Sequence, residues 1–243
     1  MALKIPKSRP KLGIIQSRGL GDIVIALPIA LHYHTRGWDI FWPISEEFLP
    51  SVVDNVPWVK WIPIKTDSGS FFYDVPYQRL KNFNCDEIIP LYQHLTGHDF
   101  INEKYFQYTK FDQYKYIKAG VPFLEKWNLE QCITRFPDRE QALYDSVVTN
   151  PNYAVVHLEG SDHRASFDPS MIPADWQTIE IQPRTGSIFD WLKVLEGAQS
   201  LIMVDSVFAN MIDQMGLGED HYFIQRSHIG LTPVLNLPWT WLP

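Results

Sequence analysis

The stretch from residue 12 to residue 28, LGIIQSRGLGDIVIALP, constrains the fold more than any other part of the chain. It begins with a β-branched apolar run at residues 12–15, passes through a glycine turn at 17–21, and has a helical pattern from Asp22 onward. This order is typical of a buried parallel strand, the turn at its carboxyl end and the helix that follows. Ligands of open α/β sheets bind at such turns, so we expect a ligand site here.

The glycine turn favours ligand binding but also has a simpler interpretation. Gly19 and Gly21 let the backbone approach a ligand closely, and Asp22 stands where a carboxylate can cap the helix or face the crevice. The simpler alternative is that Asp22 is only a helix cap and the glycines only tighten the turn. Two phosphate motifs do not fit, because Val24 replaces the third glycine of a dinucleotide motif and no Gly-Lys-Ser/Thr follows.

The rest of the chain alternates strand and helix patterns, which favours parallel sheets. We predict further strands at residues 38–44, 59–64, 87–91, 153–158, 179–182, 201–204 and 222–225. We predict helices at residues 46–53, 77–82, 137–148 and 207–215, and another that starts at Ser187 with Asp190 completing a capping box. Residues 233–243 are rich in proline and aromatic residues, and we predict no regular structure there.

The segment Thr-Asn-Pro-Asn at residues 149–152 is the best linker in the sequence. It divides the chain into a domain at residues 1–150 and a domain at 151–243, and the 45% apolar content is ample for a packed core. Both parts carry strand-to-loop junctions of the ligand-binding kind. The sequence therefore predicts an α/β protein of two Rossmann-like parallel-sheet domains that face a cleft.

Two junctions of the second domain carry small polar residues. Gly160 and Ser161 follow the predicted strand at 153–158, and Asp205 and Ser206 precede the predicted helix at 207–215. Ser206 can cap that helix, whose amino end carries partial positive charge, and both properties suit a bound phosphate. An ordinary helix cap is the alternative.

The charge is distributed unevenly along the chain. Residues 1–150 hold 17 basic and 17 acidic residues, whereas the remainder holds 4 and 11, which accounts for the net charge of −7. This balance argues against extended nonspecific binding to nucleic acid, which needs many Lys and Arg contacts to phosphates. If the second domain binds a phosphate, we expect a helix terminus and one of its few basic residues to be the donors: Arg164, Arg184, Lys193 or Arg226.

Residues 92–118 are rich in hydrogen-bonding aromatic residues without a clean period, and we expect them to determine specificity. Tyr105 and its aromatic neighbours can stack on a sugar or a base, or can simply pack a helical excursion onto the sheet. His94 and His98 are four residues apart without an adjacent third ligand, so we expect no metal there. The two cysteines are isolated and indicate neither a zinc site nor a disulfide.

No apolar run is long enough to span a bilayer, and residues 1–11 lack an apolar signal core. We therefore expect a cytoplasmic protein.

Several of these motifs together resemble the lipopolysaccharide heptosyltransferases and related glycosyltransferases of the GT-B fold, the family 9-like enzymes. They are the Gly-Leu-Gly-Asp turn with Pro28 six residues after Asp22, the Ser-Ile-Phe-Asp-Trp-Leu segment from Ser187, and the Val-Asp-Ser turn ending at Ser206. The resemblance covers the first 60 residues and about residues 153–215.

The resemblance implies an acceptor-binding first domain and a second domain that holds a nucleotide-sugar, which is a substrate rather than a cofactor. It implies that Asp22 is the general base that deprotonates the acceptor hydroxyl. It places Arg164, with His163 as second candidate, at the donor diphosphate. We expect the other donor contacts at Gly19, Gly21, Gly160, Ser161, Asp205 and Ser206, and acceptor contacts at Arg18, His94 and Tyr105.

The chain departs from the family pattern in ways that leave the donor open. Val207 and Asn210 stand where family members usually have glycine and histidine, and the chain is shorter than the bacterial enzymes. Heptose is therefore not supported as the donor sugar. The sequence predicts an inverting, metal-independent transfer of sugar to an acceptor hydroxyl.

Three alternatives stay open. One is a nucleotide-sugar epimerase, and another is a noncatalytic nucleotide-binding module. The third is a transferase that acts on hydroxymethylated bases of viral DNA, which Lys104, Lys110, Lys115 and Lys118 among the aromatic residues keep open.

Overall fold

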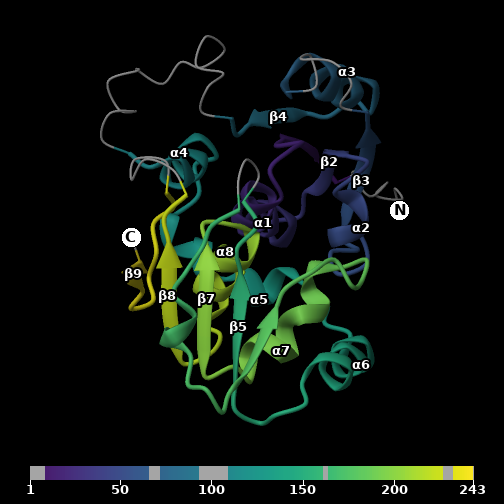
Figure 1. The fold of residues 1–243 in the computed structure, drawn as a ribbon. Coiled ribbons are helices and arrows are strands. Elements are labelled where there is room, and N and C mark those ends of the chain that lie inside the picture. The colour runs from purple at the N-terminus through teal and green to yellow at the C-terminus, as the bar shows by residue number, and fades with distance from the viewer. Residues whose placement is uncertain (1–8, 66–71, 93–108, 161–163, 227–231, 243) are drawn as a thin grey trace, which may run out of the picture.

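The computed structural model describes residues 9–65, 72–92, 109–160, 164–226 and 232–242. Within them the strands form two sheets, with the orders β3-β2-β1-β4 and β6-β5-β7-β8-β9 (Figure 1). All neighbouring strands in both sheets are parallel. The predicted α/β class with two parallel sheets is therefore confirmed.

We call the first sheet and its helices the N-lobe, and the second sheet and its helices the C-lobe. The N-lobe strands are β1 (Lys11–Ile15), β2 (Asp39–Ser45), β3 (Val59–Ile64) and β4 (Glu87–Pro90). The C-lobe strands are β5 (Tyr153–His157), β6 (Gln177–Glu180), β7 (Ser200–Val204), β8 (Asp220–Ile224) and β9 (Thr240–Leu242).

Eight α-helices and three short 3₁₀ helices in the described residues connect and cover these strands. The α-helices are α1 (Leu20–Thr35), α2 (Leu49–Val52), α3 (Asp74–Asn82), α4 (Phe111–Lys118), α5 (Leu129–Cys132), α6 (Pro137–Val147), α7 (Leu192–Glu196) and α8 (Val207–Met215). The 3₁₀ helices are η4 (Phe123–Trp127), η5 (Pro169–Met171) and η6 (Ile188–Trp191).

Strand β1 occupies the position that the opening sequence stretch predicts. Leu12, Ile14 and Ile15 have no exposed surface, and β1 pairs with β2 on one side and β4 on the other. The order of strands therefore reverses beside β1, and it reverses again beside β5, which lies between β6 and β7. Ligand crevices of parallel sheets form at the carboxyl ends of strands at such reversals.

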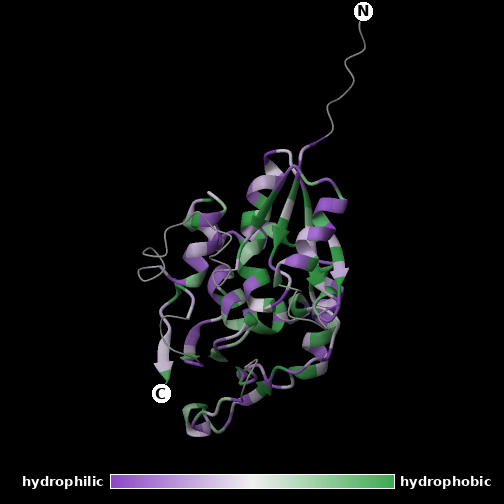
Figure 2. Ribbon diagram, turned by 90° about the horizontal axis from the view of Figure 1, so that it is seen from above, coloured by the Kyte–Doolittle hydropathy of each residue, from purple (hydrophilic) through white to green (hydrophobic). Residues whose placement is uncertain are grey.

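The two lobes share one apolar core. A single buried cluster contains Leu12 and Trp42 from the N-lobe sheet together with Val155 and Met203 from the C-lobe sheet. Helix α1 packs on α8 across the boundary, and all its residues from 23 to 30 are buried. Figure 2 shows the hydrophobic residues gathered along the strands, with hydrophilic residues frequent on the outer helices. Burial of apolar surface is therefore what holds the lobes together.

Three predicted elements differ from the structure. The helix expected at 46–53 is only α2, four residues long, preceded by a turn. The helix expected from Ser187 begins as the 3₁₀ helix η6: Ser187 Oγ accepts a hydrogen bond from the Phe189 N–H, but Asp190 binds Arg139 instead of completing a capping box.

The prediction that residues 233–243 contain no regular structure is wrong. Strand β9 pairs in parallel with β8 at the edge of the C-lobe sheet. Its three residues lack proline, and Pro238 lies outside the strand, so an edge strand forms without losing ladder hydrogen bonds. Asp213 Oδ1 fixes the approach to β9 by accepting hydrogen bonds from the backbone N–H groups of Asn236 and Leu237 at 2.8 and 3.0 Å.

None of the helices in the described ranges combines the length and the apolar character needed to cross a membrane. The thiols of Cys85 and Cys132 are both free.

A buried ion pair ties the C-terminal segment to the N-lobe side. Lys126 Nζ lies 2.8 Å from Asp112 Oδ2, and neither side chain has exposed surface. Val234 completes the arrangement, because its N–H donates to Asp112 and its carbonyl accepts from Lys126. We predict that Lys126→Met lowers the free energy of unfolding by about 3–5 kcal/mol, because Asp112 is left as an unpaired buried charge.

The matched control for this prediction is Lys60→Met, which removes an equally short but exposed ion pair with Asp39. Exposed pairs contribute about 1 kcal/mol or less. Urea denaturation of both variants measures the difference, and an equal loss in the two variants would contradict the prediction.

Candidate functional site

A cavity of about 1000 Å³ lies between the N-lobe and the C-lobe, and both lobes line it. Its N-lobe side consists of Arg18, Gly19, Leu20, Gly21, Asp22, Ile25, Phe48, Phe72, Tyr92, Phe111 and Lys115. Its C-lobe side consists of His157, Glu159, Gly160, Asp205, Ser206, Val207, Asn210 and Arg226. The glycine turn after β1 and the turn between β7 and α8 therefore face one another across the same space.

The two glycines of the turn have different structural roles. Gly19 has a φ of 77°, and a Cβ built on it would overlap Asp22 Oδ2. At Gly21 a Cβ would lie 3.6 Å from the backbone nitrogen of Val207, the first residue of α8. Gly19 thus makes room for the carboxylate, whereas the Cβ position of Gly21 is at ordinary contact distance from Val207 and shows that the amino ends of α1 and α8 lie close together. Both ends carry partial positive charge.

Asp22 faces the cavity and is held by a buried lysine. Helix α1 begins at Leu20, two residues earlier than predicted, and has no side-chain cap. Asp22 Oδ1 instead lies 2.9 Å from Lys115 Nζ, and the Asp22 side chain keeps 34% exposure while Lys115 keeps 3%. Lys115 Nζ also donates to Gln16 Oε1 at 2.7 Å and to the Leu91 carbonyl at 3.2 Å. This geometry favours a cavity-facing carboxylate over a helix cap.

Across the cavity, Ser206 points to a histidine rather than capping its helix. Ser206 is the residue before α8, but its side chain makes no cap hydrogen bond, and its Oγ lies 3.0 Å from His157 Nδ1. Burial lowers the pKa of His157 to about 4, against the opposing charges of Glu159 and Glu180. The imidazole is therefore neutral at pH 7 and can orient the Ser206 hydroxyl.

Asp205 is the second carboxylate of the cavity and has only 6% exposed surface. Burial raises the pKa of Asp205 to about 6; the charge of Asp22 adds to the rise and that of Arg226 opposes it. Asp205 thus changes its charge near pH 6, within the range where enzymes are assayed.

The structure assigns the C-lobe cation of the cavity to Arg226 and not to Arg164. Arg226 lines the cavity, whereas Arg164 is absent from the lining and forms ion pairs with Glu159 and Glu180. The expected contact of Arg164 with a donor phosphate therefore finds no support in this lining and stays a prediction. Gly160 does line the cavity, while Ser161, His163, His94 and Tyr105 lie outside the described residues.

Sequence reasoning did not name His157, named Lys115 only for the DNA alternative, and gave Arg226 only as one of four candidate phosphate donors. His157 carries a usable signal, because it is a polar residue at the end of a buried strand, two residues before the polar segment that begins at Glu159. Lys115 carries none, since a lysine in a tyrosine-rich helix is normally expected on the surface.

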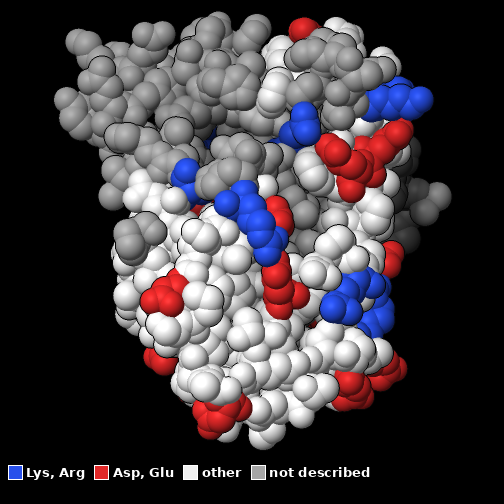
Figure 3. All heavy atoms as spheres, viewed as in Figure 1, with Lys and Arg blue, Asp and Glu red and all other residues white. Residues whose placement is uncertain are grey.

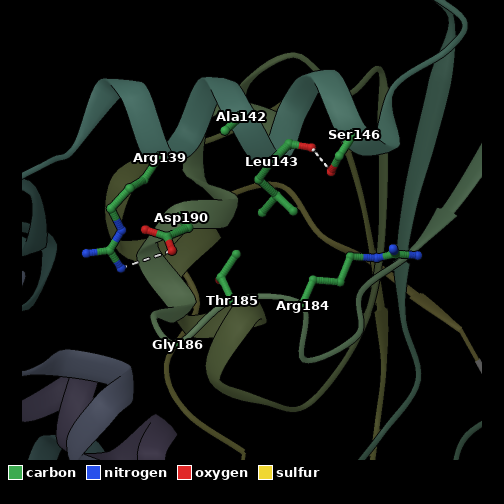
Figure 4. Close-up of a pocket in the computed structure, with 8 residues that line it drawn as sticks. All are labelled: Arg139, Ala142, Leu143, Ser146, Arg184, Thr185, Gly186 and Asp190. Atoms are coloured by element: carbon green, nitrogen blue, oxygen red, sulfur yellow. Dashed lines mark hydrogen bonds and ion pairs between the residues drawn. The ribbon is translucent and has the colours of Figure 1, made fainter.

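A second hollow, of about 520 Å³, lies beside α6 (Figure 4). Ion pairs at its edge connect the two lobes. Arg139 points to Asp190 of the C-lobe at 3.0 Å and also contacts Asp54 of the N-lobe at 3.0 Å. Arg184 extends away from this pair in Figure 4. Because two carboxylates compensate the charge of Arg139, we interpret this region as a structural contact between the lobes and not as a ligand site.

In the described ranges no three His, Cys, Asp or Glu side chains gather as metal ligands would.

No protein-family model matches the sequence, and no curated protein matches it. Solved structures do match. The chain is similar to the glycosyl transferase family 9 protein from Veillonella parvula DSM 2008, with a TM-score of 0.56, 14% identity, and coverage of 96% of this chain and 86% of that one.

Two Escherichia coli structures match over similar lengths. Heptosyltransferase WaaC with ADP-2-deoxy-2-fluoro heptose gives a TM-score of 0.54 and 12% identity, covering 96% of this chain and 92% of that chain. ADP-heptose lps heptosyltransferase II gives a TM-score of 0.53 and 10% identity, covering 96% of this chain and 90% of that chain. At these identities the likeness establishes the fold, which is the predicted GT-B-like arrangement of two parallel sheets.

The raised pKa of Asp205 predicts a pH-dependent effect on stability. The unfolded carboxyl titrates near 3.8 and the folded one near 6, so folding loses stability as pH rises through this window. Asp205→Asn removes the penalty. We expect it to stabilise the protein by about 2–3 kcal/mol at pH 8 and to have little effect at pH 4.

Asp168→Asn is the control of opposite sign, because the Ser170 N–H lowers the pKa of that exposed carboxyl. It should slightly destabilise the protein at pH 8. Thermal unfolding at the two pH values measures both variants, and a pH-independent effect of Asp205→Asn would contradict the prediction.

Proposed function

We propose that this protein is a glycosyltransferase that moves a sugar from a nucleotide-sugar donor to an acceptor hydroxyl. The observation that carries the proposal is the pairing of a cavity-facing carboxylate on the N-lobe with a cation and a helix amino end on the C-lobe, all lining one cavity. Displacement of a nucleoside diphosphate from an anomeric carbon needs a base for the hydroxyl and positive potential for the leaving group. The fold shared with the family 9 glycosyltransferase structure supports the same assignment.

In the proposed reaction, Asp22 accepts the proton of the acceptor hydroxyl. The hydroxyl oxygen then forms a bond to the anomeric carbon, while the bond from that carbon to the diphosphate oxygen breaks. The nucleoside diphosphate leaves with the electron pair, and attack from the opposite face inverts the anomeric configuration. Lys115 acts as a positioning residue, because its ammonium group fixes Asp22 Oδ1 and leaves the rest of the carboxylate to the cavity.

The leaving diphosphate would bind on the C-lobe side. The amino end of α8 and Arg226 supply positive potential there, and Ser206, oriented by His157, supplies a hydroxyl. Asp205 opposes this potential when ionised. A bound diphosphate would favour its protonated form, which then donates a hydrogen bond.

The main test is Asp22→Asn. The amide keeps the shape of the side chain but cannot accept the proton, so we expect transfer to fall about 10²- to 10⁴-fold. The donor Kd should change less than about threefold, which corresponds to less than about 1 kcal/mol, because the donor diphosphate is placed on the C-lobe side. A panel of ADP-, UDP-, GDP- and dTDP-linked sugars with mass detection of products measures transfer, and calorimetry measures binding.

The matched control is Asp74→Asn, which removes another first-turn carboxylate, on the exposed amino end of α3. It should leave transfer unchanged. Undiminished transfer by Asp22→Asn would remove the mechanism. Donor isomerisation or release without an acceptor would favour an epimerase, and absence of all nucleotide binding would favour a noncatalytic role unrelated to nucleotides.

A second prediction concerns Gly19. Gly19→Ala would place a methyl group against the Asp22 carboxylate, and a displacement of about 1 Å at a reacting group costs about 10²-fold in rate. Gly216→Ala is the control, because Gly216 also has a positive φ, of 67°, but nothing within 4 Å of its Cβ position. Both variants should lose about 1–2 kcal/mol of stability, but only Gly19→Ala should lose transfer. Equal transfer rates in the two would contradict this role of Gly19.

A further inference from the structure

The N-lobe side of the cavity has an aromatic wall. Four rings line it, contributed by Phe48 before α2, Phe72 before α3, Tyr92 after β4 and Phe111 at the start of α4. The described C-lobe lining contributes only one aromatic side chain, His157. Because the rings come from four separate segments, their gathering at one cavity is a property of the fold and not of a local sequence run.

Contacts fix two of these rings in place. Phe72 and Tyr92 pack edge to face with ring centroids 5.1 Å apart. The Tyr92 hydroxyl accepts a hydrogen bond from the Arg18 backbone N–H at 2.8 Å. The polar atom of Tyr92 is thus bonded to the glycine turn, and its ring contributes apolar surface.

Phe111 lies beside the proposed base. Its ring centroid is 5.6 Å from Lys115 Nζ, and the same ammonium nitrogen is 2.9 Å from Asp22 Oδ1. A molecule that rests on the Phe111 ring can therefore present a hydroxyl to Asp22. This places the aromatic wall where the acceptor, rather than the donor diphosphate, would bind.

The described cations of this wall are matched by carboxylates. Lys115 pairs with Asp22, and Arg18 Nη2 lies 3.4 Å from Glu47 Oε1. A phosphorylated acceptor normally needs basic residues that are not already neutralised. Figure 3 shows blue and red side chains next to each other across the middle of the face that it draws.

From this geometry we infer that the acceptor is an uncharged sugar, whose flat apolar face stacks on the aromatic wall while one hydroxyl reaches Asp22. The inference rests on the proposed function and specifies its substrate class. Small-molecule binding sites combine apolar and aromatic walls with a few placed polar groups, and the Asp22 side of the cavity has this composition. A DNA acceptor fits less well, because the protein would need many Lys and Arg side chains available to contact the phosphates of the DNA backbone.

The test compares acceptors with the donor identified by the screen. The panel consists of methyl glycosides of neutral hexoses, the 6-phosphates of the same sugars, a phenol and a DNA duplex with hydroxymethylated cytosine. We expect kcat/KM for the best neutral glycoside to exceed that for its 6-phosphate at least about tenfold. Higher activity with a phosphorylated sugar, the phenol or DNA would overturn the inference and leave the transferase assignment intact.

Variants of the wall test where the acceptor binds. Phe111→Ala should raise the acceptor KM about tenfold and change the donor KM less than about threefold, and Phe111→Trp should restore acceptor binding. Phe83→Ala is the control, since Phe83 is a half-exposed N-lobe ring outside the described cavity lining. A change in the donor KM alone would place the donor at this wall and overturn the inference. Absence of nucleotide binding and of turnover with every donor would overturn the proposed function as well.

Discussion

Helix α1 has buried residues on all sides because it packs on its own sheet, on α8, and on the segments α4, η4 and α5. A helix that is apolar all round must be covered all round, so this segment needs several partners to bury it. The amino ends of α1 and α8 also meet, since the Cβ position of Gly21 lies 3.6 Å from the backbone nitrogen of Val207. The reversal points of both sheets therefore lie opposite each other, and an apolar contact determines where the polar residues of the cavity are placed.

The electrostatics of the cavity follow from the same contact. Two carboxylates, Asp22 and Asp205, are brought into one space, where two like charges are unfavourable. Two features reduce this repulsion. The buried ammonium group of Lys115 balances the charge of Asp22, and burial raises the pKa of Asp205 to about 6, so that this carboxyl is neutral at lower pH. Below that pH the C-lobe side has Arg226 and a helix amino end without an opposing charge from Asp205, a combination that suits an anion.

The sequence predicts those features that depend on local patterns. The buried strands, the glycine turn and the exact span of β3 and α8 follow from periodicity and breakers within a few residues. Features set by distant partners could not be predicted. Strand β9 forms because β8 offers an edge. Lys115 can be buried because Asp22 balances its charge and Gln16 Oε1 accepts a hydrogen bond from it. Arg164 lies outside the cavity lining and forms ion pairs with Glu159 and Glu180. The family resemblance favoured Arg164 in the loop after β5 over the other candidates, whereas the basic residue that lines the cavity, Arg226, follows β8 in another part of the sheet.

The shared core also limits how the lobes can move. Separating them would expose the α1 and α8 faces, and each large apolar side chain brought to water costs about 1.5–3 kcal/mol. Arg139 bridges Asp54 and Asp190 across the boundary, and Ser187 Oγ lies 2.7 Å from Asn55 Oδ1 at the same junction. With apolar packing on one side and polar braces on another, hinge opening is costly. We therefore expect a ligand to enter the cavity through local movements of side chains or loops at its edge and not through separation of the lobes.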